Sequence, residues 1–432
     1  MRLDRSLTIR FAVIALAGLL IAGYLAALPR GPVLVDASFG SAQITPNADG
    51  VSDITTIHYR IRGEALLSIY LQSSDNHRYY FRHDEARSPG IYNVEFSGIV
   101  EPYAVPDEIV KGEIVQRLIP NGQYTWVIEA TSQATGHVDN SSGTLTVADA
   151  DTKLPDIWEF SVSPTVFTPN QDGLDDRVWI NVFVPKPATL VVYLINAEGR
   201  KIFIPEFQSE SQPGGEGRHS FEYDGGIDNG SDPPPDGTYQ VQVESSDAEG
   251  QKLLSTTDLT IVNGGVPLAD IVAQPVGDTV RFSSETIIVG DVLTFELTVE
   301  NYGDAPIRTT GPAPGYVYEQ DDLYSTSGFY DESGAWRVGI GCDTCLTDYP
   351  WRWALGSTST LTPIETNGIA HYYLMPGERA VITGGIRLKN IVESRNPQQF
   401  WAGLIHEDVG IAPLDSHVDP HWIEIVAGLS GF

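Results

Sequence analysis

A ten-residue motif occurs twice in the chain, as ITPNADGVSD at residues 44–53 and as FTPNQDGLDD at residues 167–176. The copies lie too far apart for a short solenoid repeat, so they indicate a duplicated domain. The apolar segment 65–71 matches segment 188–194 at the same spacing. The two copies then fall out of register because the first has a longer connection at 99–120, which we expect to be a surface loop.

Alternating apolar and polar residues indicate half-buried strands in both copies and beyond them. The 42 Gly and 28 Pro fit many short strands joined by turns. We therefore predict an all-β chain of three tandem antiparallel β-sandwiches, over residues 36–148, 156–263 and 268–432. The residues expected on the buried faces are Tyr124, Trp126, Ile128 and Ala130 in the first, Tyr239, Val241 and Val243 in the second, and Leu293, Phe295, Leu297 and Val299 in the third.

The first thirty residues are predicted to lie outside the sandwiches, as a signal anchor or signal peptide. Three Arg residues precede an uncharged apolar stretch at 11–28, which as a helix would rise roughly 27 Å and so cross a bilayer. The basic flank favours an N-terminus inside and the remainder outside the cytoplasm. We favour an uncleaved single-pass transmembrane anchor, and the alternative is a cleaved leader and a secreted protein.

The chain is strongly acidic, with 57 Asp and Glu against 26 Lys and Arg and a formal net charge of −31. Binding a phosphate backbone requires clustered Lys and Arg, so nucleic acid is excluded as an expected partner. A self-repelling acidic surface keeps an extracellular protein soluble, and part of it can also collect divalent cations.

The two repeats resemble the Ig-like domain of the flagellar hook-capping (FlgD) family. The resemblance depends on Thr-Pro-Asn-x-Asp-Gly in both copies and, in the second, on segments 221–225 and 236–239. The first copy departs from the pattern, with Ser97 where the second has Asp224. More loosely, segments 289–291, 301–303 and 376–378 resemble turns of bacterial cell-adhesion-related (CARDB-type) Ig-like domains. The resemblance implies Ig-like sandwiches of a bacterial surface protein that seldom carry catalysis themselves.

Each motif places an Asn and two Asp around a Gly turn, with oxygen ligands at a spacing that suits Ca²⁺. We predict a structural Ca²⁺ ion as the one candidate cofactor. The alternative is a turn in which these side chains accept backbone N–H groups without a metal. The candidate ligands are Asn47, Asp49 and Asp53 in the first copy and Asn170, Asp172 and Asp176 in the second.

Cys342 and Cys345 are the two cysteines of the chain, and outside the cytoplasm we expect them to form a short-loop disulfide. The alternatives are a redox pair, or a zinc site that adds His417 and His421.

Aromatic residues crowd a long insertion in the third domain. Exposed rings can stack on sugars or act as interface hot spots, whereas buried rings would form a small core for the insertion. Arg337 and Arg352 lie beside Trp residues there, which allows internal cation–π pairs. The candidate ligand-binding residues are Tyr316, Tyr318, Tyr330, Trp336, Tyr349, Trp351 and Trp353.

No nucleophile elbow, HExxH, P-loop or dinucleotide fingerprint occurs in the sequence. We interpret His406-Glu407-Asp408 as a turn at a strand end. The sequence therefore predicts a non-catalytic envelope protein with a structural or adhesive role and an envelope protein or polysaccharide as its partner. The alternatives are a carbohydrate-binding surface protein that uses the aromatic insertion, and an envelope hydrolase or its accessory subunit.

Overall fold

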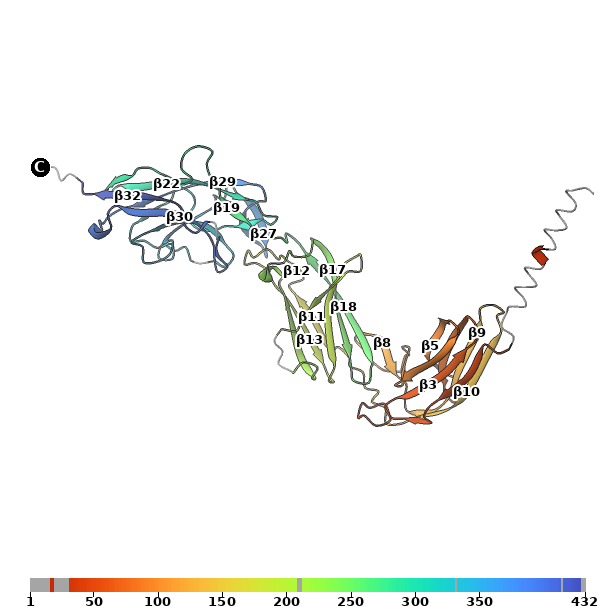
Figure 1. Ribbon diagram of the computed structural model, residues 1–432. Helices are drawn as coiled ribbons and strands as arrows, with labels where there is room; N and C mark the ends of the chain where they lie inside the picture. The colour runs from red at the N-terminus through yellow and green to blue at the C-terminus, as the bar shows by residue number, and fades with distance from the viewer. Residues whose placement is uncertain (1–15, 19–30, 208–211, 331, 413–414, 429–432) are drawn as a thin grey trace, which may run out of the picture.

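The computed structural model describes residues 16–18, 31–207, 212–330, 332–412 and 415–428. Strands and turns dominate, and three sandwiches follow one another along an elongated molecule (Figure 1). Within the described residues, no helix has the length and apolar character needed to span a membrane. All but three residues of the predicted anchor at 11–28 fall outside the described part of the chain.

The first sandwich pairs a three-stranded sheet, β1-β3-β6, with a five-stranded sheet, β2-β10-β9-β4-β5. Its core is built from residues of the first repeat, and the predicted inward face of β9 is buried. The strands are β1 (Leu34–Phe39), β2 (Gln43–Ile44), β3 (Thr55–Ile61), β4 (Ala65–Gln72), β5 (Arg78–Arg87), β6 (Gly90–Phe96), β9 (Gly122–Ser132) and β10 (Val138–Val147).

The second sandwich repeats this plan with a three-stranded sheet, β11-β13-β16, and a larger sheet that contains β15-β14-β17-β18. Tyr239, Val241 and Val243 are buried on β17, as predicted. Its elements are β11 (Glu159–Ser163), β12 (Val166–Phe167), β13 (Val178–Val184), β14 (Thr189–Ile195), β15 (Lys201–Ile204), β16 (Gly217–Tyr223), the 3₁₀ helix η1 (Ile227–Asn229), β17 (Gly237–Ser246) and β18 (Lys252–Ile261).

The third sandwich is larger and adds a small sheet, β23-β28-β27, to its two main sheets, β19-β22-β29-β24 and β21-β32-β30-β25-β26. The predicted inward face of β22 is buried. Its elements are β19 (Ala269–Ile271), β20 (Arg281–Phe282), β21 (Thr286–Ile288), β22 (Val292–Asn301), β23 (Ile307–Arg308), β24 (Val317–Glu319), β25 (Trp336–Cys342), β26 (Trp351–Ala354), β27 (Thr362–Thr366), β28 (Ile369–Leu374), β29 (Arg379–Arg387), η2 (Glu393–Arg395), β30 (Gln398–His406), β31 (Gly410–Ile411) and β32 (Val418–Val426).

All three sandwiches share one departure from purely antiparallel pairing. A short strand near the start of each runs parallel to that sandwich's last strand: β2 to β10, β12 to β18 and β21 to β32. The chain then crosses to the opposite sheet, where the next strand lies. In the first two sandwiches the repeated motif makes this crossing, so we call residues 45–53 the first crossing loop and residues 168–176 the second.

The long connection at 99–120 was wrongly predicted to be a surface loop. It contains β7 (Ile99–Val100) and β8 (Glu113–Leu118), which pair with each other. β8 also pairs antiparallel with β18, so the first repeat contributes two strands to the sheet of the second sandwich. Backbone hydrogen bonds between sandwiches therefore fix their relative position more firmly than a plain linker would.

Buried polar side chains complete this first junction. The Gln251 side chain accepts a hydrogen bond from the N–H of Leu118 and donates to the carbonyls of Asp151 and Lys153 in the linker. Lys186, which is 7% exposed, binds Asp247 and Glu249, each at 2.9 Å. The side chains of both carboxylates are almost fully buried, so the Lys186 ammonium is the group that neutralises them.

We expect Lys186→Met to lower the free energy of unfolding of the second sandwich by about 3 kcal/mol, because two buried carboxylates would lose their counter-charge. The matched control is Lys252→Met, whose partly exposed pair with Glu244 spans 3.6 Å and should contribute less than about 1 kcal/mol. Calorimetry on the chain from Gly31 onward measures both. Equal, small effects would contradict the assigned role of Lys186.

Candidate functional site

The two crossing loops have closely similar internal hydrogen bonds. In the first, the Asp53 carboxylate accepts hydrogen bonds from the N–H groups of Asn47, Ala48 and Gly50, at 3.2, 3.0 and 2.7 Å. In the second, the Asp176 carboxylate accepts from Asn170, Asp172 and Gly173, at 3.2, 3.2 and 2.6 Å. One carboxylate thus gathers three backbone donors, which is the role of Asp in turns that require no metal.

The remaining motif residues complete these turns. The side-chain oxygen of Asn47 accepts from the N–H of Asp49, and Asp49 accepts from Val51. Asn170 and Asp172 repeat both bonds in the second loop. The glycine is required because the backbone at Gly50 and Gly173 has φ of +84° and +82°, a region that disfavours side chains.

The loops differ in what surrounds them. The first crossing loop is largely exposed, and Val51 at its tip is 66% exposed. In the second, Asn170 is 2% and Asp172 4% exposed, because this loop inserts into the third sandwich. A Cβ atom on Gly173 would lie 2.0 Å from the carbonyl oxygen of Ser333, so glycine also permits the close approach of the two domains.

Three side chains of the third sandwich bind the inserted loop, and we call Arg308, Tyr373 and His406 the socket. Arg308 Nε donates to the carbonyl of Asp172 at 2.6 Å, and the Tyr373 hydroxyl donates to its carboxylate at 2.7 Å. His406 Nε2 lies 2.8 Å from the carbonyl of Gln171, which makes it the donor of that bond. Arg308 also binds the carbonyl of Ser333, so it bridges the loop and its own domain.

Burial perturbs the titration of these groups. It raises the pKa of Asp176 to about 6, and the charge of nearby Asp172 adds to this rise. Burial also raises the pKa of Asp172, and the hydrogen bond from Tyr373 opposes that rise. Burial lowers the pKa of His406 to about 4, so the imidazole is neutral at neutral pH.

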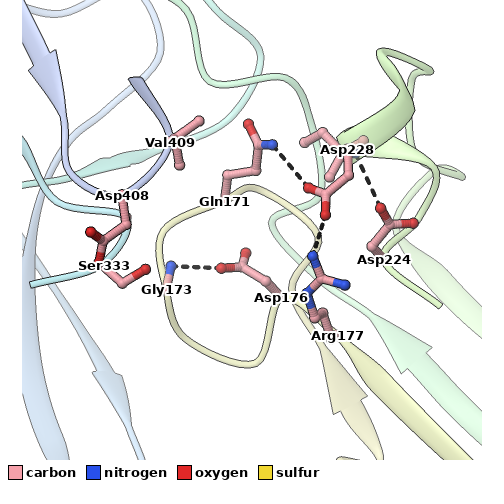
Figure 2. A pocket seen from close by; sticks show the side chains of 11 residues that line it. Gln171, Gly173, Asp176, Arg177, Asp224, Asp228, Ser333, Asp408 and Val409 are labelled. Carbon is pink, nitrogen blue, oxygen red and sulfur yellow. Dashed lines mark hydrogen bonds and ion pairs between the residues drawn. The ribbon is translucent and has the colours of Figure 1, made fainter. Parts of the chain in front are cut away.

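A polar cavity of about 340 Å³ lies beside the second crossing loop (Figure 2). Of the four carboxylates that line it, Asp176, Asp228 and Asp224 have structural partners, and Asp408 is the fourth. Asp176 holds the loop, Asp228 binds Arg177 and Gln171, and Asp224 accepts from the N–H groups of Gly226 and Asp228.

Calcium binding at the motifs remains a prediction. The structure places the predicted ligands of each copy together in one loop, but it directs their oxygens at backbone N–H groups. In the second loop, the Tyr373 hydroxyl donates a hydrogen bond to the remaining carboxylate oxygen of Asp172. The interpretation of each motif as a metal-free turn accounts for every one of these hydrogen bonds.

The aromatic insertion is mostly core. Of the seven candidate ligand-binding residues, Tyr318, Trp336, Tyr349, Trp351 and Trp353 are between 0% and 5% exposed. Since buried rings offer no face to a sugar, the prediction that they bind a ligand is wrong for these five. Tyr316 and Tyr330 are 37% and 72% exposed, respectively, and keep that prediction open.

The predicted cation–π pairs exist with a different partner. Arg352 and Arg337 lie over the ring of Tyr324, at 3.9 and 6.0 Å from its centroid. Glu407 binds Arg352 and Arg337 at 2.6 and 3.2 Å in the interior. The chain does turn at Glu407 and Asp408, as predicted, but the burial of His406 and Glu407 was missed. The sequence signal for this burial was the position of His406 and Glu407 at the end of a strongly apolar strand.

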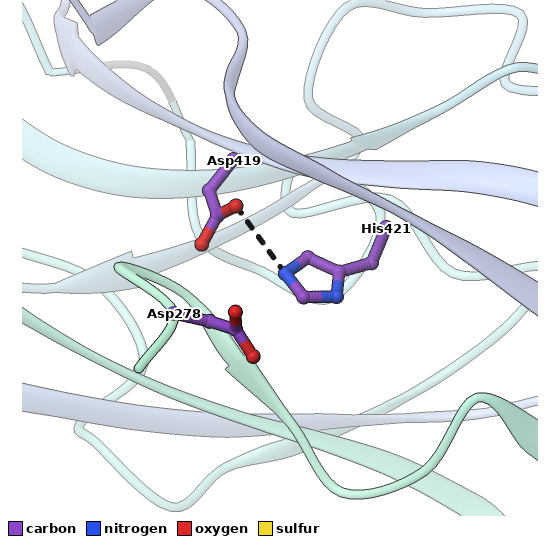
Figure 3. Close-up of side chains that lie close together, drawn as sticks. All are labelled: Asp278, Asp419 and His421. Atoms are coloured by element: carbon purple, nitrogen blue, oxygen red, sulfur yellow. Dashed lines mark ion pairs between the residues drawn. The ribbon is translucent and has the colours of Figure 1, made fainter. Parts of the chain in front are cut away.

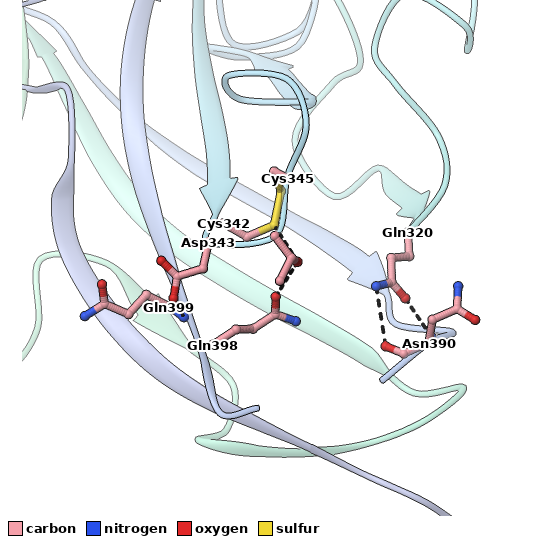
Figure 4. Close-up of a disulfide and its surroundings, with 8 residues drawn as sticks. Gln320, Cys342, Asp343, Cys345, Asn390, Gln398 and Gln399 are labelled. Carbon is pink, nitrogen blue, oxygen red and sulfur yellow. Dashed lines mark hydrogen bonds between the residues drawn. A yellow bond between two sulfur atoms is a disulfide. The ribbon is translucent and has the colours of Figure 1, made fainter. Parts of the chain in front are cut away.

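The structure contains the predicted Cys342–Cys345 disulfide (Figure 4), with Cα atoms 5.2 Å apart. Thr344 between them donates to Gln398, and Asp343 accepts from the N–H of Gln399, so the short loop is attached to β30. Oxidised sulfurs are not zinc ligands, and His417 stacks on Trp401 at 3.9 Å. The cysteine–histidine zinc alternative therefore has no support, and the redox alternative remains a prediction.

No protein-family model matches the chain, so the resemblance to hook-capping and cell-adhesion domains remains a prediction. No curated protein matches it either. Among solved structures, the chain is similar to native E. coli alpha-2-macroglobulin (10% identity, TM-score 0.20), to a tetra-tandem repeat from the extending region of a large adhesion protein (9%, 0.17) and to SGBP-B of a Bacteroides ovatus mixed-linkage glucan utilization locus (10%, 0.16).

These similarities cover 92%, 85% and 93% of this chain and 23%, 81% and 70% of the other chains, respectively. The chain thus spans about a quarter of the macroglobulin chain. At such low identities and TM-scores, the similarities carry no argument about function.

We expect Tyr373→Phe to lower the free energy of unfolding by about 1–3 kcal/mol, because a buried oxygen of Asp172 would lose its donor. The matched control is the neighbouring Tyr372→Phe, whose hydroxyl has no bond to the loop. Thermal melting and protease sensitivity of segment 262–268 measure the loss. Identical behaviour of the two variants would contradict docking through Tyr373.

The pH dependence of the junction provides a second test. His406 has a folded pKa of about 4, below the ordinary 6.5, so its contribution to stability is complete above pH 6.5 and is lost as pH falls toward 4. Asp176 acts in the opposite direction, because lowering the pH through 6 removes the penalty of its buried charge.

Comparison with His406→Gln separates the two groups, since Asp176 is present in both proteins. From pH 7 to pH 4, wild type should lose up to about 3 kcal/mol more stability than the variant. Denaturant titrations at both pH values measure the difference. Parallel pH profiles would contradict a buried, neutral His406.

Proposed function

We infer that this chain is a non-catalytic, extracytoplasmic envelope protein that acts as a stiff spacer and interaction module. The observation that carries this proposal is the construction of both junctions. A strand of the first repeat joins the sheet of the second sandwich, and the second crossing loop inserts into the third. Domains joined only by linkers rotate freely, whereas these share hydrogen bonds and buried side chains.

The acidic surface and the disulfide fit a location outside the cytoplasm. With the predicted anchor at the N-terminal end, the elongated arrangement in Figure 1 would hold the third sandwich away from the membrane. The partner would be an envelope protein or a polysaccharide. Burial of five aromatic candidates favours a protein partner over stacking on sugars.

The first crossing loop supports the interaction role. It repeats the backbone of the loop that docks on a neighbouring domain, but the structure leaves it exposed. The carbonyls of Ala48 and Asp49 and the Oδ2 atom of Asp49 correspond to the acceptors that the socket binds in the second loop. A partner with Arg and Tyr donors would fit this surface.

Spin labels across each junction test the spacer role. Ile91→Cys with Phe203→Cys spans the first junction, and Phe203→Cys with Val381→Cys spans the second; all three side chains are at least 58% exposed. The native cysteines are paired and should not react. We expect one narrow distance distribution per pair by electron–electron double resonance. Broad distributions, as for a flexible linker, would contradict the proposal.

The interaction role has its own test. The full chain and a variant with Asp49→Ala and Val51→Ser in the first loop are compared for binding to purified envelope proteins and cell-wall glycans. We expect protein binding that the loop variant weakens. Equal binding by both proteins, or binding to glycans alone, would contradict this contact surface.

A further inference from the structure

We propose that Asp278, Asp419 and His421 of the third sandwich bind a divalent transition-metal ion, with Zn²⁺ as the expected occupant. The ligating atoms of these three side chains all lie within 4.8 Å of one another. Figure 3 shows the two carboxylates and the imidazole converging on one space between a loop and a strand. This cluster lies apart from the crossing loops and from the cysteines.

The strand β32 places two of the ligands. His421 lies on the same face of the strand as the buried Ile423 and Ile425. Asp419 lies in a bulge of β32 against β30, where its φ is +49° and the exposed Pro420 follows it. The His421 ring packs edge-on against Phe282, at 5.5 Å between centroids, which restricts its orientation.

The third ligand comes from the loop between β19 and β20. Asp278 lies on its exposed part, two residues before Val280, whose N–H donates to Asp419 at 2.9 Å. That hydrogen bond aligns the loop with β32 and uses one oxygen of Asp419. The other oxygen lies 3.4 Å from His421 Nε2.

The environment of His421 Nε2 adds to this geometry. The atom is buried and forms no hydrogen bond in the described part of the structure, and its contact with Asp419 is a long ion pair of 3.4 Å. A buried polar atom without a hydrogen bond is destabilising, and native structures rarely leave one unexplained. A metal ion between the imidazole and the two carboxylates would satisfy it.

The ligand chemistry selects the class of metal. Ca²⁺ takes six to eight oxygen ligands, whereas an imidazole with two carboxylates suits Zn²⁺ and its neighbours. Zn²⁺ binds N and O ligands at roughly 2.0–2.2 Å, which puts ligand atoms closer together than 4.8 Å. The exposed Asp278 can move to close that distance. The bound ion would then attach loop 272–280 to β32, with its remaining position open to water.

The test is zinc binding by the full-length protein in detergent, before and after Asp278→Asn. This exposed substitution keeps the side-chain shape and should not disturb folding. We expect wild type to bind Zn²⁺ with an affinity at least about tenfold higher than the variant, and to melt at a higher temperature with Zn²⁺. Calorimetric titration and thermal melting measure both effects. His421→Gln should show the same loss.

The matched control is Asp321→Asn, another exposed carboxylate of the third sandwich, with 67% of its side chain accessible. It should bind Zn²⁺ as wild type does. Cobalt provides a spectroscopic readout, because Co²⁺ held by nitrogen and oxygen ligands absorbs visible light and Asp278→Asn should abolish this band. Equal zinc affinity of wild type and Asp278→Asn, or displacement of the ion by millimolar Ca²⁺, would overturn the proposal.

Discussion

The hydrogen bonds from three backbone N–H groups to one carboxylate, at Asp53 and again at Asp176, are the interaction on which the first two sandwiches depend. A chain that leaves one sheet and enters the opposite one exposes its backbone donors at the edge of the sandwich. Unpaired donors there would be costly if buried. The Asp carboxylate satisfies them at once, and the glycine at positive φ allows the tight path.

The same loop meets two different environments. In the first sandwich it remains at the surface, whereas in the second it carries Asp172 into a socket of Arg308, Tyr373 and His406. Most internal bonds are the same in both loops, so the loop behaves as a preformed unit that docks with little reordering. Preformed contacts avoid part of the entropy cost of association, which suits a junction that must keep its geometry.

At the first junction, a different set of interactions fixes the relative position of the two sandwiches. There, strand pairing between β8 and β18 supplies direction, and the buried Lys186 among Asp247 and Glu249 supplies charge balance. The strand pair links the two sandwiches directly, and Lys186 and Gln251 attach the linker residues Asp151 and Lys153 to the second sandwich. Together the two junctions explain how a chain with a formal charge of −31 can remain extended without depending on repulsion alone.

Local pattern in the sequence was enough to predict much of the fold. The alternation at Tyr124 to Ala130 and at Leu293 to Val299 requires half-buried strands, because a period of two admits one buried face. The Asn-x-Asp-Gly spacing requires a turn for similarly local reasons. The short disulfide followed from two cysteines placed three residues apart in a chain expected outside the cytoplasm.

Contacts between distant segments were decided by tertiary structure alone. Nothing near Tyr373 in the sequence indicates that it binds Asp172, and nothing near Asp278 indicates that it faces His421. Similarly, the sequence allowed the aromatic rings between Tyr318 and Trp353 to form either an exposed patch or a core. Burial depends on which surfaces the folded sheets bring together, and that is a property of the whole sandwich. The sequence by itself determined the strands and turns, whereas packing between sheets and between sandwiches decided which residues were available to bind anything else.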